Sequence, residues 1–258
     1  MKYSFSEKLS FFKKVVCQVD NWYIIPLVYW GLFKKEFFVL NLKNGQRLKL
    51  RTNSTDFYAF VNVWIVEEYR KDGFEIGKND AVIDIGGHVG IFSVYASQFC
   101  KNGQIVSFEP IKDNFVLLQE NIELNKLANV KTFNVAVAGK KDRIKIYHSD
   151  DQSAYTVYGS NQNYIETDAI PLKEILDSNH IERCGLLKLD CEGAEYEILA
   201  SLPDEYFNRI DRICMEYHPV KSSSERLIEL TARLEKLEYK ITTIPYSDGL
   251  GLLFANKQ

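Results

Sequence analysis

The chain has 258 residues, of which 46% are hydrophobic and 26% charged, and its formal net charge is -3. This length can hold one α/β domain with a sizeable core and a modest extension. The slight negative charge gives no sign of a polyanion partner, so we expect no nucleic-acid partner. Five cysteines, an odd number without CxxC spacing, argue against a disulfide framework or a zinc site.

The first 35 residues are expected to form an accessory, helical segment. Lys8, Lys13 and Lys14 interrupt it before the apolar core of a signal peptide could form, which predicts a cytoplasmic protein. The longest apolar run, residues 22–33, is too short to span a bilayer. Its aromatic residues and flanking lysines would suit a peripheral membrane contact. The interpretation that we favour is a cap that packs on the main domain or on a second subunit, as in a homodimer.

A hairpin and a helix are expected next. Two alternating runs, Phe37–Leu42 and Gln46–Arg51, flank an Asn-Gly turn, which is a strong hairpin signal. Thr55 or Asp56 could cap a helix that ends near Tyr69. We expect the hairpin and helix to cross the carboxyl edge of a following sheet, where they could cover a ligand.

The chain is expected to divide into an accessory segment, 1–75, and a main domain, 76–258. From Asp80 onward strands and helices alternate, which predicts an α/β fold with a doubly wound, mainly parallel, seven-stranded sheet. The predicted strands are 81–85, 104–108, 130–137, 186–190, 212–217, 239–244 and 252–256. The predicted helices are 91–99, 113–125, 172–178, 194–202 and 224–237. An insertion between residues 139 and 171 is expected to carry two more strands, 143–147 and 164–170, around a polar loop.

One strand-to-helix turn contains an acid and three glycines, Asp84, Gly86, Gly87 and Gly90. A dinucleotide fingerprint would need a further glycine at position 85, which is Ile85. An acid in this turn would repel a pyrophosphate and attract an ammonium or a sulfonium, such as that of S-adenosylmethionine. The alternative is an ordinary turn with glycines for packing.

The next predicted strand ends in Glu109, about 20 residues beyond the turn, where an acid commonly accepts hydrogen bonds from ribose hydroxyls. Glu109 alone could be a surface residue. At this distance from the glycine turn, we favour the ribose interpretation.

Five segments together resemble the FkbM family of S-adenosylmethionine-dependent methyltransferases. They are Val82-Ile-Asp-Ile-Gly-Gly-His-Val-Gly90, Ser107-Phe-Glu-Pro110, Asn114-Phe115 with Asn121, Leu187-Lys-Leu-Asp-Cys-Glu-Gly-Ala-Glu195 and Glu216-Tyr-His-Pro219. The likeness runs from about Asn41 to the C-terminus. It implies a Rossmann-like class I methyltransferase fold with one antiparallel strand. It further implies that Val135 and Ala136 flank the adenine.

The chain departs from this family at two positions. His88, in the cofactor-binding turn, stands where the family more often has Asn. Lys173 stands where a Leu-Asp pair is usual.

Candidate catalytic residues close the fourth and fifth predicted strands. Asp190 with Glu192, and Glu216 with His218, are two apart, so each pair could face one side. Methyl transfer to a hydroxyl needs a group that takes the hydroxyl proton, and His218 has a suitable ordinary pKa. Asp190 or Glu192 could orient this ring or accept the proton. Asp190 could instead cap a helix, and His218 could only satisfy a turn.

The same side chains could hold a divalent cation. No Asp-Asn ligand pair follows the fourth predicted strand, so we expect no metal. Lys188 is expected to pair with a carboxylate of the cleft.

These features predict an O-methyltransferase acting on a hydroxyl. The resemblance implies that this hydroxyl belongs to a sugar, in a surface glycan or a nucleotide-sugar precursor. The acceptor pocket would use residues 1–75 and the loop 149–163, with Tyr155 and Tyr158 available for stacking. A natural-product hydroxyl is an alternative acceptor. The rival functions are a nucleotide-dependent oxidoreductase and a catalytically silent cofactor-binding module.

Overall fold

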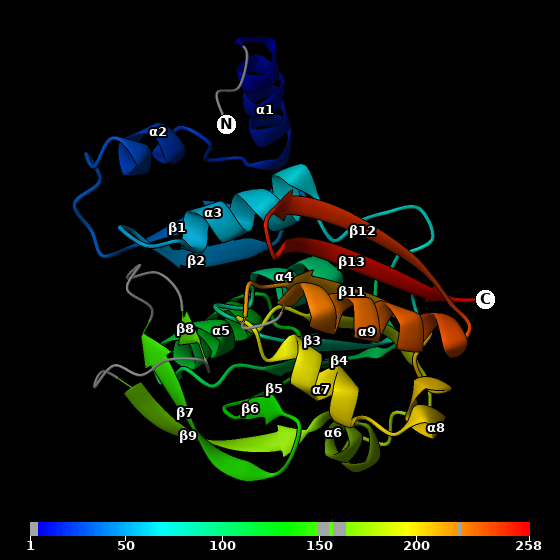
Figure 1. Cartoon of the computed structure of the whole chain (residues 1–258). Coiled ribbons are helices and arrows are strands. Elements are labelled where there is room, and N and C mark those ends of the chain that lie inside the picture. Colours follow the sequence, from blue (N-terminus) through cyan, green and yellow to red (C-terminus); the bar gives the residue numbers. More distant parts are fainter. Residues whose placement is uncertain (1–4, 149–154, 157–163, 221–222) are drawn as a thin grey trace.

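The computed structural model describes residues 5–148, 155–156, 164–220 and 223–258 (Figure 1). Within these residues, seven strands form the central sheet in the spatial order β12-β13-β11-β10-β3-β4-β5. The strands are β3 (Ala81–Ile85), β4 (Gln104–Phe108), β5 (Val130–Phe133), β10 (Cys184–Leu189), β11 (Arg212–Tyr217), β12 (Tyr239–Ser247) and β13 (Leu250–Lys257). Strand β13 is antiparallel to both of its neighbours, whereas β3, β4, β5, β10 and β11 run parallel. The predicted doubly wound, seven-stranded sheet is therefore confirmed.

The sheet is buried on both faces, because successive side chains of its apolar strands point to opposite sides. On one face, Val82 and Ile105 pack with helices α4 (Ile91–Ala96) and α5 (Lys112–Leu124). On the other face, Ile83 and Val106 pack in a second core. That core includes residues of α6 (Leu172–Ser178), α7 (Glu195–Ser201), α8 (Asp204–Phe207) and α9 (Ser223–Lys236).

The third predicted strand, Val130–Val137, is two strands in two different sheets. Strand β5 ends at Phe133, and Ala136–Ala138 form β6 of a second, four-stranded sheet. Between them, Asn134 donates its side-chain N–H to the carbonyl oxygens of Glu109 (2.9 Å) and Pro110 (3.0 Å), and the chain leaves the main sheet there.

The second sheet has the order β6-β9-β7-β8, and its other members are β7 (Asp142–His148), β8 (Tyr155–Thr156) and β9 (Tyr164–Pro171). Strands β7 and β9 correspond to the two strands predicted in the insertion. Tyr158 and most of the predicted loop lie outside the described residues, as does the side chain of Tyr155.

The N-terminal part forms α1 (Phe5–Gln18), α2 (Ile24–Tyr29), the hairpin β1 (Phe37–Asn41) and β2 (Arg47–Arg51), α3 (Asp56–Phe60) and the π-helix η1 (Val61–Val66). The predicted hairpin is confirmed. The predicted helix ends before Tyr69, because Glu67 adopts a left-handed conformation with φ of 57°. Neither proposed cap forms: the Thr55 side chain makes no capping hydrogen bond, and the Asp56 carboxylate binds Arg51 instead.

The hairpin is joined to the main domain by buried polar contacts. The Asn121 side chain on α5 accepts the Lys49 backbone N–H (2.7 Å) and donates to the carbonyl oxygens of Lys49 (3.0 Å) and Val89 (2.8 Å). Apolar residues of β1, β2 and η1 belong to the same core as those of α4 and α5. The described side chains of the segment 1–75 therefore share a hydrophobic core with the rest of the chain, and the division from 76–258 stays a prediction.

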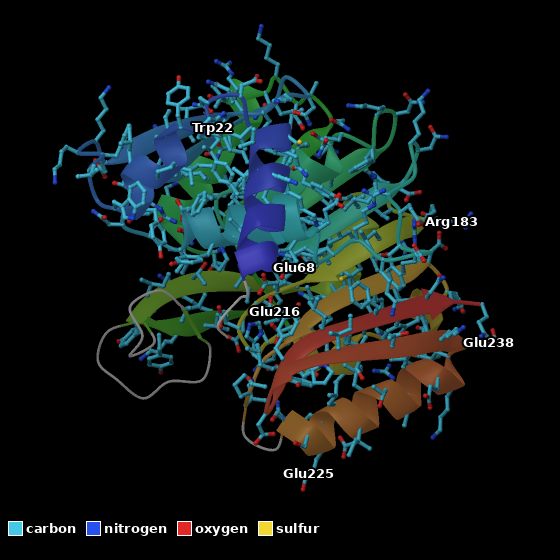
Figure 2. The ribbon with its side chains drawn as sticks, turned by 90° about the horizontal axis from the view of Figure 1, so that it is seen from above. Trp22, Glu68, Arg183, Glu216, Glu225 and Glu238 are labelled. Atoms are coloured by element: carbon cyan, nitrogen blue, oxygen red, sulfur yellow. The ribbon has the colours of Figure 1, made fainter. Side chains whose placement is uncertain are left out.

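The apolar run 22–33 is only partly packed on the main domain. Trp22, labelled in Figure 2, makes an edge contact with Phe12 and packs on the core. Helix α2 has no buried residue, and Tyr29 and Trp30 are 71% and 68% exposed. The predicted cap thus holds for Trp22 but not for the outer face of α2. No described helix has the length and apolarity needed to cross a membrane. The membrane contact and the homodimer stay predictions.

Candidate active site

A cavity of about 650 Å³ opens at the carboxyl ends of β3, β4, β10 and β11. This is where ligands bind on open α/β sheets, and the volume lies in the range of small-molecule sites. Residues of α3, η1 and the segment after η1 form another wall of the cavity. The prediction that the hairpin and helix lie across the carboxyl edge of the sheet is therefore confirmed for α3, η1 and the segment after η1.

The glycine turn after β3 lines the cavity with bare backbone. Gly86 has φ of 79°, a conformation that L side chains rarely adopt. A Cβ atom on Gly86 would lie 1.7 Å from the Asp190 carbonyl oxygen, and one on Gly87 would lie 2.2 Å from the Ser107 hydroxyl oxygen. The backbone N–H groups of Gly86 and Gly87 donate to the Phe108 carbonyl oxygen (3.0 and 2.9 Å). After Gly90, α4 begins, as predicted.

Asp84 lies beneath this turn and does not reach the cavity. Its carboxylate is fully buried, accepts the hydroxyls of Ser93 (2.7 Å) and Ser107 (3.2 Å), and lies 3.1 Å from the Lys188 Nζ. The Lys188 ammonium also donates to the Gly86 carbonyl oxygen (2.8 Å). The structure thus corrects the prediction that Asp84 itself holds the amino-acid end of the cofactor. Asp84 acts through Lys188, which fixes the turn. The Lys188 Nζ also lies 3.7 Å from the Asp190 Oδ2 at the cavity wall, which confirms the expected pairing of Lys188 with a carboxylate of the cleft.

Glu109 closes β4 at the cavity wall. It accepts the backbone N–H groups of His88 (2.8 Å) and Ile111 (2.9 Å) and a long contact from the Asn114 amide (3.4 Å). Burial raises the pKa of Glu109 to about 7, against these hydrogen bonds. Its position beside the turn is the one predicted for a ribose ligand.

The His88 side chain, in the turn itself, also lines the cavity. Its Nε2 lies 3.3 Å from the Arg51 Nη2 and 3.4 Å from the Asp56 Oδ1. Burial lowers the pKa of His88 against the charge of Asp56, which acts to raise it, and the charge of Arg51 acts in the same direction as burial. Of the two predicted adenine neighbours, Ala136 lines the cavity at the start of β6, whereas Val135 is outside the described lining.

Four carboxylates gather at the β10 and β11 end of the cavity. Glu68 and Glu216 lie close together in Figure 2, and Asp190 and Glu192 line the same cavity. Burial and the charge of Asp190 raise the pKa of Glu68 to about 7 and that of Glu216 to about 8. Burial raises the pKa of Glu192 to about 7. Burial also acts to raise the pKa of Asp190, but the charges of Lys188 and His218 hold it below its ordinary value.

His218 stands among these acids. Its Nδ1 lies 2.9 Å from the Glu195 Oε1, and its Nε2 lies 3.6 to 4.0 Å from oxygens of Asp190, Glu192 and Glu216. Burial acts to lower the pKa of His218, but the hydrogen bond and charge of Glu195 raise it to about 10. At neutral pH the His218 ring is therefore positively charged, with a proton on each nitrogen. The structure thus does not support His218 as the group that accepts the hydroxyl proton. Asp190 does not cap the following helix, because α7 has Ala194 as its N-cap and no side-chain capping hydrogen bond. The Asp190 Oδ2 instead accepts the Tyr69 hydroxyl (3.1 Å).

Comparison with protein families identifies the family of the chain that carries this site. The model of the methyltransferase FkbM domain matches residues 84–241, more than half of the chain. The chain belongs to the FkbM methyltransferase family. The resemblance seen in the sequence is thus confirmed. The match also removes the support for a nucleotide-dependent oxidoreductase.

Relatives of this FkbM methyltransferase are distant. The 31-O-demethyl-FK506 methyltransferase FkbM of Streptomyces tacrolimicus is 21% identical over 222 residues, covering 74% of this chain and 85% of that protein. The AMB antimetabolite synthetase AmbE of Pseudomonas aeruginosa is 23% identical over 218 residues, 69% of this chain. The chain spans only 10% of the length of AmbE. Among solved structures, M. jannaschii TYW2 in complex with AdoMet is 18% identical, with 87% of this chain and 86% of that chain covered and a TM-score of 0.48.

Membership of the FkbM family confirms S-adenosylmethionine as the predicted cofactor. The cavity fits this molecule: the bare turn at Gly86 and Gly87 allows close approach of a ligand, and Glu109 stands beside it with an acceptor carboxylate. These residues would hold the amino-acid end and the ribose, respectively.

Two residues of the candidate site were not identified from the sequence. Tyr69 was predicted only as the end of a helix, and no local pattern marks its hydroxyl as a partner of Asp190 and Glu216. Glu195 had only a weak signal, as an acid in the first turn of a helix; in the structure its carboxylate accepts the backbone N–H of Cys191 (2.8 Å). Its contact with His218 joins two elements distant in sequence.

Replacing Glu109 by Gln is expected to weaken S-adenosylmethionine binding by roughly 10-fold to 100-fold, the range for a lost hydrogen bond to a charged group. The amide would also place an N–H donor against the N–H of His88 or Ile111. Because ribose hydroxyls need an acceptor, the wild-type affinity should rise as the pH rises through about 7, where Glu109 ionises. Calorimetric titration from acidic to alkaline pH measures both effects. The matched control is Glu123→Gln, an exposed change on α5; equal affinities of the two variants would remove Glu109 from the site.

Proposed function

We propose that this FkbM methyltransferase transfers a methyl group from S-adenosylmethionine to a hydroxyl oxygen of a sugar, in a surface glycan or a nucleotide-sugar precursor. When bound, the cofactor supplies a methyl group on a sulfonium, which a hydroxyl oxygen can attack. The observation that carries the proposal is the cluster of four carboxylates at the ends of β10 and β11, Glu68, Asp190, Glu192 and Glu216. Carboxylates accept hydrogen bonds from hydroxyl groups, so this wall suits a polyhydroxylated acceptor.

The placement of the two ends of the cavity supports this arrangement. Glu109 follows β4, and Glu216 belongs to the end of β11, three strands away in the sheet. At about 4.8 Å per strand, the ends of these two strands lie about 14 Å apart along the sheet edge. The cavity can therefore hold the nucleoside at the β4 end and the acceptor at the β11 end.

Among the acids, Glu192 is the best candidate to accept the hydroxyl proton. Its pKa of about 7 is near that of an effective general base at neutral pH, whereas Asp190 is a weaker base because its pKa is lowered. The pKa values of Glu68 and Glu216, about 7 and about 8, are similar, so the backbone of Glu192 decides among these three acids. Glu192 also adopts φ of 56°, which is uncommon for a residue other than glycine. Such backbone conformations cluster at active sites, where the surrounding structure maintains them.

Replacing Glu192 by Gln is expected to lower kcat by roughly 100-fold or more, within the range for loss of general-base catalysis, while cofactor affinity changes little. In the wild-type enzyme, kcat/KM should fall as the pH decreases through about 7, because protonated Glu192 cannot accept a proton. The variant should lose this pH dependence. Steady-state kinetics against pH measures both. Glu197→Gln, an exposed change in α7, serves as the control; an unaltered pH profile in Glu192→Gln would contradict the assignment.

A natural-product hydroxyl is the second candidate acceptor, because the Streptomyces tacrolimicus relative is a 31-O-demethyl-FK506 methyltransferase. Isotope-labelled S-adenosylmethionine, incubated with the protein and panels of nucleotide-sugars, glycans and macrolide alcohols, separates the candidates by mass spectrometry. We expect a labelled methyl group on a sugar oxygen. Methylation of macrolides alone would replace the sugar proposal, and binding of the cofactor without any product would favour a silent binding module.

A further inference from the structure

Three side chains at the acidic end of the cavity offer one ligand atom each to a common point. The atoms, from Asp190, Glu216 and His218, all lie within 4.8 Å of one another. The His218 Nε2 lies 3.9 Å from the Asp190 Oδ1 and 4.0 Å from the Glu216 Oε1. In an octahedral site with bonds of about 2.1 Å, ligand atoms lie about 3.0 Å apart when adjacent and about 4.2 Å apart when opposite. The three atoms can therefore bind one ion after small side-chain shifts.

The orientation of the His218 ring is an independent observation. Its Nδ1 bonds to Glu195, which is fully buried and is not part of the three-ligand group. The Glu195 Oε1 also accepts the Cys191 N–H, and its Oε2 has no hydrogen-bond partner among the described residues. A metal-binding histidine usually donates its second N–H to such a carboxylate, which fixes the tautomer and aims the other nitrogen. Here the aimed nitrogen, Nε2, faces Asp190 and Glu216.

We propose that Asp190, Glu216 and His218 bind one divalent cation of the Mn²⁺ or Mg²⁺ class, with Glu195 as the carboxylate that orients His218. Two carboxylate oxygens and one imidazole nitrogen suit such a cation better than a thiolate-seeking metal. In the bound state Nε2 carries the cation in place of a proton. Three protein ligands leave coordination positions open towards the cavity.

The role of this cation rests on the proposed function, although its binding does not. An open position can take the acceptor hydroxyl oxygen, whose pKa the cation lowers. Glu192 then accepts the hydroxyl proton, the oxygen electron pair forms the new bond to the methyl carbon, and the electron pair of the broken carbon–sulfur bond stays on sulfur. The cation thus positions and activates the oxygen without changing oxidation state.

Binding of Mn²⁺ to the wild-type protein, without cofactor or acceptor, tests the site directly. Calorimetry should give one site per chain, and pulsed electron paramagnetic resonance should show coupling of the bound Mn²⁺ to a nitrogen-14 nucleus, from His218. Absence of binding at millimolar Mn²⁺ overturns the proposal. Binding without nitrogen coupling overturns it as well, because His218 would not be a ligand.

Variants then assign the ligands. Glu216→Gln should weaken Mn²⁺ binding by at least 100-fold, and Glu195→Gln by roughly 10-fold to 100-fold, as for outer-shell partners of metal-binding histidines. Glu225→Gln is the matched control, since Glu225 is exposed on α9 and lies far from Glu216 in Figure 2. Unchanged affinity in Glu216→Gln overturns the proposal. Mn²⁺ binding with these losses, but no methylation of any acceptor, supports the metal site and contradicts the proposed function instead.

Discussion

Replacing Asp84 by Ala should destabilise the protein by about 3–5 kcal/mol even without cofactor. The change removes the nearer of the two carboxylates around a buried ammonium and leaves only Asp190, at 3.7 Å. Lys188 is 3% exposed and lies 3.1 Å from the Asp84 Oδ1. Cofactor affinity should fall as well, because the same ammonium binds the Gly86 carbonyl oxygen. Urea unfolding of the cofactor-free variant measures the change in the free energy of unfolding.

A double variant separates the buried charge from other effects of the Asp84 change. Asp84→Ala with Lys188→Met removes both charges and should recover part of the lost stability. Glu120→Ala is the control for a surface pair: it breaks the ion pair with Lys49 (2.7 Å), whose partners are 44% and 31% exposed, and should cost less than about 1 kcal/mol. Equal losses for Asp84→Ala and Glu120→Ala would show that the buried pair is not a stabilising element.

The pH dependence of this ion pair has a definite sign. Burial acts to lower the pKa of Lys188, but the nearby charges of Asp84 and Asp190 outweigh it and raise the pKa above the ordinary value. The folded protein therefore holds this proton more tightly than the unfolded chain does. The resulting stability is complete below about pH 10 and is lost as the pH rises through the folded-state pKa.

Much of the fold could be predicted because its signals are local. Buried strands such as β3 and β4 are short apolar runs rich in β-branched residues, and each was placed to the residue. The turn between β1 and β2 could be recognised from two adjacent residues, Asn44 and Gly45. The error at the third strand arose where a tertiary contact overrides this pattern: Asn134 bonds to carbonyl oxygens after β4, and β6 pairs with the distant β9 instead.

The site could be located from the sequence, but the roles of its residues could not be predicted. Asp84, Glu109 and Asp190 were recognised by their place at strand ends. Whether an acid faces the cavity or lies beneath it depends on a partner far along the chain, as Lys188 is for Asp84. The protonation of His218 depends likewise on Glu195, whose hydrogen bond raises its pKa. Such pairings are set by how the elements pack, and no spacing in the sequence records them.

The second large effect is expected from Gly86→Ala, which should weaken cofactor binding by more than about 100-fold. The variant should also lower the free energy of unfolding, and the left-handed backbone conformation by itself accounts for about 1–3 kcal/mol of this loss. The added Cβ would lie 1.7 Å from the Asp190 carbonyl oxygen, so the turn after β3 and the loop after β10 must move apart. This movement would displace the Asp190 carboxylate and the backbone on which the cofactor is expected to rest. Calorimetry with S-adenosylmethionine and urea unfolding measure the two effects.

Gly45→Ala separates the collision from the backbone strain. Gly45 has φ of 89°, close to that of Gly86, but a Cβ there would meet nothing within 4 Å. This hairpin variant should therefore show the cost of the left-handed conformation and bind the cofactor normally. Gly86→Ala should lose more stability than Gly45→Ala, and only Gly86→Ala should lose affinity for the cofactor. Matching results for the two variants would mean that the contact between the glycine turn and the Asp190 loop does not shape the binding site.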